Sequence, residues 1–370
     1  MRQRGILFSY PKHGANVFEQ MKKKLNVFIQ TEKRLVFQTE KKKLNVCIQA
    51  EKRSVFMVRR SIQAIRVHQY GGPEQLKLEQ IPCPEPQVDE VLVRVHATGV
   101  LPAEWKVRQG LFQRFRPASF PYIPGSAFAG IVEEVGPGVT TFQKGQEVFG
   151  RSNNGAYAEY TTVSEETLAL KPASLSYAEA ATISGGATVA WTALFEDGAL
   201  QAGQRVLIHG AAGGVGLFAV QFARWKGARV IGTASTANVE FVRSLGAETV
   251  IDYTSTPFEQ AVQDVDLVLD TIGGETLQRS MQVVKRGGML VSLLEQPSQE
   301  KARELDIRAM KNTAALPFPS TTLLQTIAQL IEKGLVKVTI AQTFALHEAN
   351  LAHELSQSGH GRGRIVLLIS

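Results

Sequence analysis

The sequence predicts an α/β protein, in which a doubly wound parallel sheet is inserted into a β-rich domain. Three observations indicate this fold class. Short strand patterns cut by Gly and Pro fill residues 62–163, apolar strands then alternate with helices to about residue 294, and strand patterns return near the C-terminus. Such alternation is typical of a parallel sheet covered by helices on both faces. The length of 370 residues suits two domains of ordinary size.

Residues 1–57 form a basic extension that we expect to lie outside the fold. The stretch KKKLNVFIQTEKRLVFQTE (22–40) is followed directly by KKKLNVCIQAEKRSVFMVR (41–59), and 13 of 19 positions match. Two copies are too few for a solenoid, which needs about three units. One interpretation is translated upstream sequence with the true start at Met57. The competing interpretation is a targeting peptide, which the scarcity of Ser and the four glutamates disfavour.

The net charge of +7 belongs to this extension. Residues 1–60 hold 15 of the 41 basic but only 4 of the 34 acidic residues, so residues 61–370 carry a net charge of −4. We therefore expect no nucleic-acid partner, although a basic tail can bind anions or membranes. No apolar run approaches the roughly 18 residues that span a bilayer, so no membrane partner is expected. Two cysteines, Cys47 and Cys83, cannot form a disulfide framework, and a cytoplasmic setting is the simplest.

Residues 58–182 are predicted to form the first part of the β-rich domain. The run VLVRVHATG (91–99) alternates apolar and polar residues, and the Pro-rich connector IPCPEPQVDE precedes it. In residues 120–150, Gly and Pro cut the strands at short intervals, as in a compact, irregular barrel. GAYAEYTTV (155–163) is predicted to be a further strand.

Residues 183–308 are predicted to form the doubly wound domain. A helix is expected to begin at the N-cap Ser176 and to stop at Gly198, leading into this domain. The strand patterns RVLIHG, ARVIGTAS, TVIDY, VDLVLDTIG and GMLVSLL then alternate with helix patterns that include NVEFVRSLG and ETLQRSMQVVKRG. Because the strands are almost wholly apolar, we expect both faces of the sheet to be buried.

Residues 309–370 are expected to return to the β-rich domain. This segment contains a predicted helix over residues 321–334, with Gly334 as its C-cap. The runs LVKVTI (335–340) and GRIVLLI (363–369) are predicted to be strands.

The stretch HGAAGGVG (209–216) joins a predicted strand to a predicted helix. Aligned to the pattern G-x-G-x-x-G, Ala211 replaces the first Gly, while Gly213 and Gly216 match. Gly213 would let a pyrophosphate approach the backbone, and the N–H groups at the helix start would bind it. The alternative is a tight turn without a ligand. We expect a dinucleotide to contact Ala211, Ala212, Gly213, Gly214 and Val215.

The second strand of this unit ends in Thr233, Ala234 and Ser235. An NAD-preferring site usually places Asp or Glu here to bind the ribose 2′-hydroxyl. The absence of a carboxylate favours NADP(H), and Asn238 could donate a hydrogen bond, although no Lys or Arg follows immediately.

The chain after the basic extension resembles the medium-chain dehydrogenase/reductase superfamily, specifically its zinc-free quinone oxidoreductase (zeta-crystallin-like) branch. The resemblance covers residues 62–370 and is carried by VLVRVHATGVLPAEWKVRQG, IPGSAFAGIVEEVGPGVTTFQKGQEVFG, HGAAGGVG, SLGAETVIDY, DTIGG and GRIVLLI. It implies a GroES-like catalytic domain with an inserted Rossmann domain, an active-site cleft between them and commonly a homodimer.

The resemblance also implies that zinc is not used. Zinc-dependent relatives place Cys and often His where Leu101 and Pro102 stand, and His-Glu where Ser126 and Ala127 stand. Their structural zinc needs four clustered cysteines, and residues 62–370 contain only Cys83. We expect no metal site, and single histidines are expected to be ordinary core or surface residues, namely His68, His96 and His209.

The activity implied by the resemblance is hydride transfer from NADPH to a quinone or an α,β-unsaturated carbonyl. The quinone reductases resemble GVNPVD where this chain has GVLPAE, so Leu101 replaces a polar Asn and Glu104 replaces Asp. Glu104, Trp105 and Tyr157 are expected to line the substrate pocket as its catalytic residues, although Trp105 could be packing surface. The alternative, favoured by Leu101, is a non-catalytic NADPH-binding protein.

The remaining cofactor residues are carried over by position. Thr188 matches a threonine near the nicotinamide, and Tyr253 matches a residue on the adenosine side, with buried structural roles open for both. The other four residues lie in the loop after the strand VDLVLD and in the terminal Gly-Arg pair, which matches Gly-Lys in the family; they are Thr271, Gly273, Gly363 and Arg364.

Overall fold

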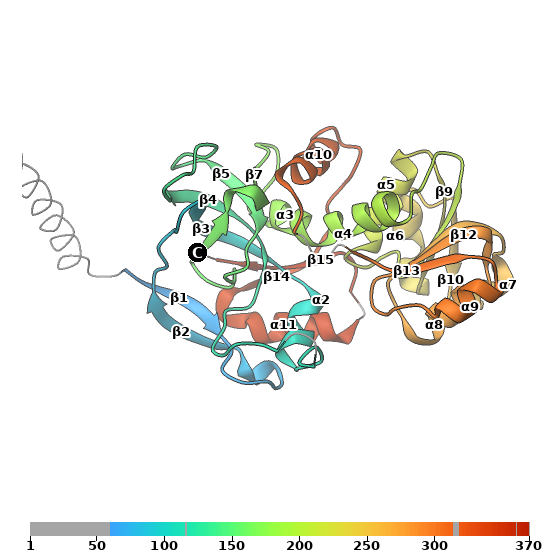
Figure 1. Cartoon of the computed structure of the whole chain (residues 1–370), viewed down its shortest axis with the longest axis horizontal. Coiled ribbons are helices and arrows are strands. Elements are labelled where there is room, and N and C mark those ends of the chain that lie inside the picture. The colour runs from blue at the N-terminus through green and yellow to red at the C-terminus, as the bar shows by residue number, and fades with distance from the viewer. Residues whose placement is uncertain (1–59, 115–116, 314–317, 360, 370) are drawn as a thin grey trace, which may run out of the picture. The chain divides into compact units, whose positions relative to one another are not determined.

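The computed structural model describes residues 60–114, 117–313, 318–359 and 361–369, and it contains two large β-sheets (Figure 1). Both sheets lie in one compact unit, Ser61–Ser370. The predicted extension at residues 1–57, with its repeats and its alternative start at Met57, lies outside the described residues.

The β-rich domain is built on a seven-stranded sheet in the order β14-β15-β3-β4-β5-β7, with β6 paired to β3. β15 runs antiparallel to β3, so the C-terminal segment completes a sheet that residues 90–170 begin. A separate hairpin-like pair contains β1 (Ser61–Arg66) and β2 (Lys77–Pro82). The seven strands are β3 (Glu90–Val100), β4 (Ala127–Val135), β5 (Glu147–Arg151), β6 (Tyr160–Ser164), β7 (Leu168–Leu170), β14 (Ile340–Ala345) and β15 (Arg364–Leu368).

The second sheet has six strands in the order β10-β9-β8-β11-β12-β13, and every neighbouring pair is parallel. The chain moves outward from β8 on one side and then returns to continue on the other side at β11. This order defines a switch point between β8 and β11, the place where doubly wound sheets bind ligands. The strands are β8 (Arg205–Ile208), β9 (Arg229–Ala234), β10 (Thr249–Asp252), β11 (Val265–Asp270), β12 (Val284–Ser292) and β13 (Arg308–Lys311).

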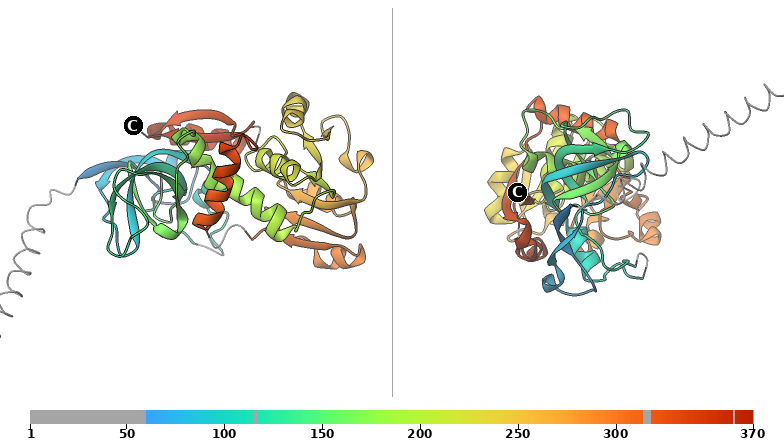
Figure 2. Two further views of the ribbon diagram at one scale, coloured as in Figure 1. Left: turned by 90° about the horizontal axis from the view of Figure 1, so that it is seen from above. Right: turned by 90° about the vertical axis from the view of Figure 1, so that its left-hand side faces the viewer.

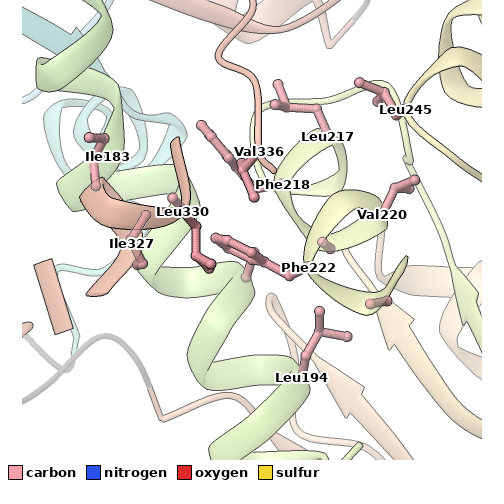
Figure 3. Packing of buried hydrophobic residues seen from close by; sticks show 14 of the residues in the cluster. Ile183, Leu194, Leu217, Phe218, Val220, Phe222, Leu245, Ile327, Leu330 and Val336 are labelled. Carbon is pink, nitrogen blue, oxygen red and sulfur yellow. The ribbon is translucent and has the colours of Figure 1, made fainter. Parts of the chain in front are cut away.

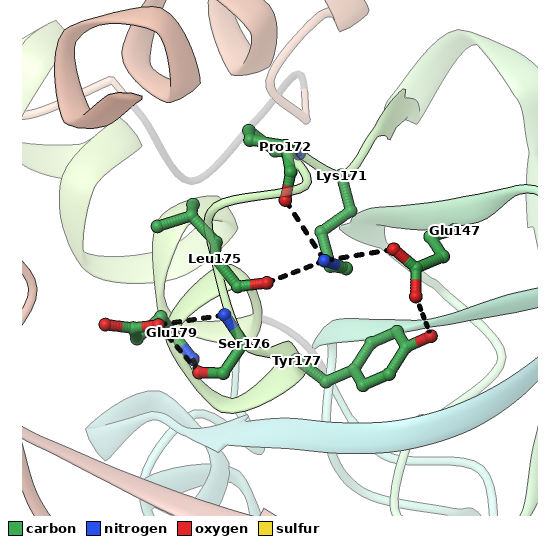
Figure 4. A network of polar contacts seen from close by, with 7 residues as sticks. All are labelled: Glu147, Lys171, Pro172, Leu175, Ser176, Tyr177 and Glu179. Carbon is green, nitrogen blue, oxygen red and sulfur yellow. Dashed lines mark hydrogen bonds and ion pairs between the residues drawn. The ribbon is translucent and has the colours of Figure 1, made fainter. Parts of the chain in front are cut away.

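A continuous helical run over residues 177–197 leads from the seven-stranded sheet to the parallel sheet (Figures 1 and 2). It consists of α3 (Tyr177–Thr182), α4 (Thr188–Trp191) and two π-helical segments, Ile183–Ala187 and Thr192–Asp197. The run begins at the predicted N-cap, where Ser176 and Glu179 form a reciprocal capping box. Figure 4 shows this cap beside Lys171, whose ammonium group donates to the Leu175 carbonyl and pairs with Glu147.

The other helices are short and follow the strands. They are α2 (Pro102–Arg108), α5 (Gly216–Trp225), α6 (Val239–Ser244), α7 (Phe258–Ala261), α8 (Gly274–Ser280), α9 (Gln299–Glu304), α10 (Thr321–Glu332) and α11 (Ala349–Ser358). No helix in the described part of the chain is both long and apolar enough to cross a bilayer.

One buried apolar cluster connects the two sheets. It extends from Ala97 and Phe149 of the seven-stranded sheet to Phe218 and Phe222 on α5. Ile183, Leu194, Ile327 and Leu330 join it from the helical run and α10 (Figure 3). Burial of each large side chain stabilises the fold by about 1.5–3 kcal/mol. The shared core therefore fixes the helical run against the helix that follows the glycine loop.

Several predicted elements were wrong in their boundaries. The strand predicted over residues 155–163 begins only at Tyr160. The strand predicted at residues 335–340 begins only at Ile340, because Val336 enters the core and Gln221 takes the backbone polar groups of Lys337. The helix predicted over ETLQRSMQVVKRG ends at Ser280, because Val284 already pairs with Val265 in the parallel sheet.

The predicted domain boundaries fall inside regular elements. The boundary at residues 182 and 183 lies within the helical run, and the boundary at residues 308 and 309 lies within β13. The division into segments 58–182, 183–308 and 309–370 therefore stays a proposal.

Candidate active site

The glycine loop joins β8 to α5 at the switch point of the parallel sheet. Its left-handed turn is at Gly210, with φ of +64°, one residue before the predicted position of the first Gly. After that turn, the Ala211 N–H donates to the Thr233 carbonyl at 3.1 Å. A Cβ on Gly216 would lie 2.2 Å from the Gly210 carbonyl oxygen, so packing of the helix against the strand requires this Gly.

Gly213 differs from Gly216 in what surrounds it. A Cβ on Gly213 would come within 4 Å of a single described protein atom, the Gly210 carbonyl oxygen at 3.2 Å. The fold therefore crowds this partly exposed position less than it crowds Gly216, where the same oxygen would lie 2.2 Å from a Cβ. A ligand that approaches the backbone at the start of α5 would use the space beside Gly213, as a pyrophosphate does in dinucleotide sites.

The C-terminal segment of the β-rich domain contacts the same loop. The Gly363 N–H donates to the Ala212 carbonyl at 3.0 Å, and the Arg364 Nη1 donates to the Gly214 carbonyl at 3.5 Å. Gly363 has φ of +88°, and a Cβ there would lie 2.4 Å from the Thr339 carbonyl oxygen. The predicted residues Ala212, Gly214, Gly363 and Arg364 are thus brought together.

The guanidinium of Arg364 is buried against glycine backbone. The residue is 3% exposed, and its Nε and Nη2 have no hydrogen-bond partner among the described residues. Burial lowers the pKa of Arg364 to about 10, which still leaves it charged at neutral pH, while Glu104 and Tyr157 oppose the shift. An added Cβ would approach this group at four glycines, namely Gly99, Gly185, Gly186 and Gly214. A buried cation with so few partners indicates a site for an anion.

Glu104 joins two loops beside this cation. Its carboxylate accepts hydrogen bonds from the Leu101 N–H at 3.0 Å, the Ser126 N–H at 3.1 Å and the Tyr157 hydroxyl at 2.7 Å. Burial of the carboxyl group raises the pKa of Glu104 to about 7, although these three bonds act in the opposite direction. The predicted pair Glu104 and Tyr157 is therefore in direct contact.

The polar network continues to two residues that sequence reasoning missed. Tyr157 Oη lies 3.2 Å from His353 Nε2, and Arg108 Nε donates to His353 Nδ1 at 3.4 Å. Since Tyr157 donates to Glu104, it accepts from His353, which is consequently neutral with its proton on Nε2. Burial lowers the pKa of His353 to about 3, in agreement with this neutral state. His353 lies outside the motifs that carry the resemblance, and Arg108, near the end of VLVRVHATGVLPAEWKVRQG, gives no local sign of a contact 245 residues away.

The other predicted pocket and cofactor residues lie on separate elements. Trp105 on α2 is partly buried, and its indole Nε1 has no hydrogen-bond partner among the described residues. Thr188 is 3% exposed and donates to the Ser184 carbonyl at 3.2 Å, a contact within its own helix. Tyr253 is 55% exposed after β10. Thr271 donates to the His209 carbonyl at 2.8 Å, and Gly273, with φ of +79°, donates its N–H to the Asp270 carboxylate at 3.0 Å.

The predicted adenosine side lies at the end of β9. Ala234 ends the strand, and Ser235 Oγ accepts a hydrogen bond from Asn238 Nδ2 at 3.2 Å. Arg362, which was not predicted, donates from Nε to Asn238 Oδ1 at 3.2 Å. The first Arg in the sequence GRGR (361–364) was the only local signal for it, because the contact spans 124 residues of chain.

The residues present do not fit zinc. Leu101, Pro102 and Ala127 have no donor atoms in their side chains, and the carboxylate of Glu104 is already bonded to backbone N–H groups. Within the described ranges, no group of three or more His, Cys, Asp or Glu side chains could hold a metal ion. Buried His209 is instead a core residue, bonded to Thr233 and Ser280.

Comparison with known proteins identifies the family. Residues 87–173 match the alcohol dehydrogenase GroES-like domain, and residues 245–367 match the zinc-binding dehydrogenase family. The chain is 35% identical to the quinone oxidoreductase of Mus musculus, over 84% of this chain and 99% of that protein. The corresponding protein of Rattus norvegicus is 34% identical over the same shares of the two chains.

Solved structures agree with this match. The quinone oxidoreductase of Coxiella burnetii superposes with a TM-score of 0.78 at 33% identity, covering 84% of this chain and 100% of that chain. The Escherichia coli quinone oxidoreductase complexed with NADPH gives a TM-score of 0.77 at 28% identity, covering 83% and 99%. The chain is therefore an oxidoreductase that belongs to the quinone oxidoreductase branch of the medium-chain dehydrogenase/reductase superfamily.

Proposed function

We propose that this oxidoreductase uses NADPH to reduce a quinone or an α,β-unsaturated carbonyl, without zinc. The observation that carries the proposal is the buried Arg364 guanidinium beside the Gly214 carbonyl, with two nitrogens lacking described partners. Together with the backbone of the glycine loop, it fits the pyrophosphate of a dinucleotide. The relative complexed with NADPH supports this choice of cofactor.

The chain offers contacts along the full length of such a cofactor. The backbone of residues 211–215 and Arg364 would contact the pyrophosphate, although the N–H groups of Ala211 and Gly213 are already bonded to the Thr233 and Gly210 carbonyls. Ser235 and Asn238 would hold the adenosine ribose. Thr271 and Gly273 flank the loop on the β11 side of the switch point, and Thr188 would lie near the nicotinamide. NADPH supplies the hydride when bound, and the protein orients the reactants and excludes water.

The acceptor class follows from the groups in the pocket. Carbonyl-to-alcohol reduction in zinc enzymes uses the metal as an electrophile. A conjugated acceptor needs only a hydrogen-bond donor for the oxygen that gains electron density. Trp105 Nε1 is a buried donor without a described partner, and the Glu104–Tyr157 pair can hold a proton near neutral pH. We propose these three residues as the substrate side of the site.

The alternative function is NADPH binding without catalysis. Leu101 favours it, because this residue is 8% exposed and offers no polar atom where the family has an amide. An assay of NADPH oxidation against panels of quinones and enones separates the two. Turnover supports the reductase; a thermal shift with NADPH but no turnover on any acceptor supports the binding protein. Activity that requires stoichiometric zinc would overturn the zinc-free assignment.

We further propose a homodimer in a cytoplasmic setting, on the family resemblance alone. Light scattering of the purified full chain tests the assembly. A mass corresponding to one 40.5 kDa chain would contradict it.

A further inference from the structure

The turn that follows β9 lacks a basic residue of its own. Residues 235–238 read Ser-Thr-Ala-Asn, and no Lys or Arg follows before Arg243. The fold supplies a cation to this turn from a distant part of the chain. Arg362, just before β15, reaches it from the C-terminal segment of the β-rich domain.

Three contacts fix the position of the Arg362 guanidinium. Nε donates to Asn238 Oδ1 at 3.2 Å, and Nη2 donates to the Ala237 carbonyl at 3.1 Å. The guanidinium carbon lies 4.8 Å from the centroid of the Phe241 ring, a cation–π distance. The two hydrogen bonds use two of the five N–H donors of an arginine. No other acceptor pairs with Arg362 in the described part of the chain, and the residue is exposed.

The same contacts fix the orientation of the Asn238 and Ser235 side chains. Because Asn238 Oδ1 accepts from Arg362, its amide nitrogen faces Ser235, and Ser235 Oγ accepts from that nitrogen at 3.2 Å. The Ser235 hydroxyl proton is then available to donate to a ligand. The carboxylate of Asp252, which contacts this turn, already accepts from Thr236 and Thr254.

This arrangement is the reverse of an NAD-type site. There, a carboxylate at the end of the second strand binds the ribose 2′-hydroxyl and repels a 2′-phosphate. Here that position is Ser235, and an arginine with three donors to spare lies beside it. We propose that Arg362, with Ser235, binds the 2′-phosphate of NADPH and sets the preference of this chain for NADPH over NADH. The inference rests on the proposed function, because it assumes a nicotinamide dinucleotide at the glycine loop.

A single short segment then carries both cations of the cofactor site. Arg362 reaches the end of β9, Gly363 bonds to Ala212, and Arg364 reaches Gly214. The positive φ of Gly363 lets the two arginines leave the backbone near different parts of the parallel-sheet domain. Substitution at Arg362 is therefore expected to weaken the binding of NADPH far more than that of NADH.

The test is the affinity of the full chain for NADPH and for NADH, measured by fluorescence titration and calorimetry. In Arg362→Gln we expect the Kd for NADPH to rise about 10- to 100-fold, the effect of losing one charge-assisted hydrogen bond to a phosphate. The Kd for NADH should change less than about twofold. Arg362→Lys keeps the charge but loses the fixed fork, so an intermediate loss is expected.

The matched control is Arg229→Gln. Arg229 begins the same strand at its opposite end and pairs with Glu248 in the solvent, with a side chain that is 60% exposed. This variant makes the same charge change away from the turn, so both affinities should match those of the wild type.

The outcomes separate the inference from the proposed function. If the wild type binds NADPH and Arg362→Gln weakens neither cofactor, or both equally, the inference is wrong and the proposed function stands. If the wild type binds NADH more tightly than NADPH, the inference is also wrong and the binding of a nicotinamide dinucleotide still stands. If the wild type binds neither dinucleotide, the proposed function is wrong and the inference fails with it.

Discussion

Glu104→Gln is predicted to remove one specific pH dependence from the stability of the protein. The Glu104 carboxyl lies between the Leu101 and Ser126 N–H groups and the Tyr157 hydroxyl. Its pKa is raised from 4.5 to about 7, chiefly because burial disfavours the charged form. The folded protein therefore binds a proton that the unfolded chain has already released at pH 6.

The direction and size of the Glu104 contribution to the free energy of unfolding follow from this difference in pKa. A group whose pKa is raised on folding contributes stability that is complete below the unfolded pKa and is lost as pH rises through the folded pKa. The interval from 4.5 to about 7 corresponds to at most about 3 kcal/mol. The Glu104 contribution to the free energy of unfolding should therefore decrease between about pH 4.5 and 7 and stay constant above about pH 7.

The assay is denaturant unfolding of wild type and Glu104→Gln from pH 5 to 8, taken as the difference between the two. The difference is needed because His209 and His353 act in the opposite direction. Burial lowers the pKa of each to about 3, so their contributions are lost as pH falls below the ordinary His value. Both histidines are present in both proteins, and their effects largely cancel.

A difference that does not vary with pH would refute this reasoning, whatever its absolute size. A Tyr157→Phe variant gives a second check. The Tyr157 hydroxyl hydrogen bond lowers the pKa of Glu104, so its removal should move the pH window of the effect upward. A window that moves downward would contradict the proposed direction of that hydrogen bond.

Two further predictions concern the loop and its cation. Gly213→Val should abolish NADPH binding and should cost less free energy of unfolding than Gly216→Val, because its Cβ would lie 3.2 Å from the Gly210 carbonyl oxygen, whereas a Cβ on Gly216 would lie 2.2 Å from the same atom; Gly216→Val should cost about 1–3 kcal/mol or more in denaturant unfolding. Equal losses of stability in both variants would contradict this distinction. Arg364→Met should leave stability unchanged or increase it, because a buried cation is replaced by an apolar chain, while calorimetry shows weaker NADPH binding by about 10- to 100-fold. Unchanged NADPH affinity would contradict the role of Arg364.

The parallel sheet could be predicted from the sequence because its signals are local. The apolar runs around Val206 and Leu267 and the glycine loop each lie within a few residues of chain. In this loop the positive φ lies at Gly210, one residue before Ala211, which occupies the first Gly position of the aligned pattern. The glycine pattern alone does not show that the tight turn lies at Gly210, one residue before the pattern begins.

Contacts between distant segments could not be predicted. Lys337 reads as part of a strand, yet its backbone bonds to Gln221, 116 residues away, so the strand starts later. His353 reaches Tyr157 from α11, and Arg362 reaches the turn after β9. In each case the partner is chosen by the packing of two sheets, which no local pattern contains.

The central claim is that the glycine loop and Arg364 bind a phosphorylated nicotinamide dinucleotide. The most direct measurement is the melting temperature of the full, metal-free chain titrated with NADPH. Saturation at about 100 times the Kd should add about 2.7 kcal/mol, or roughly 5–10 °C for a domain of this size. A melting temperature that does not move at millimolar NADPH would contradict the claim.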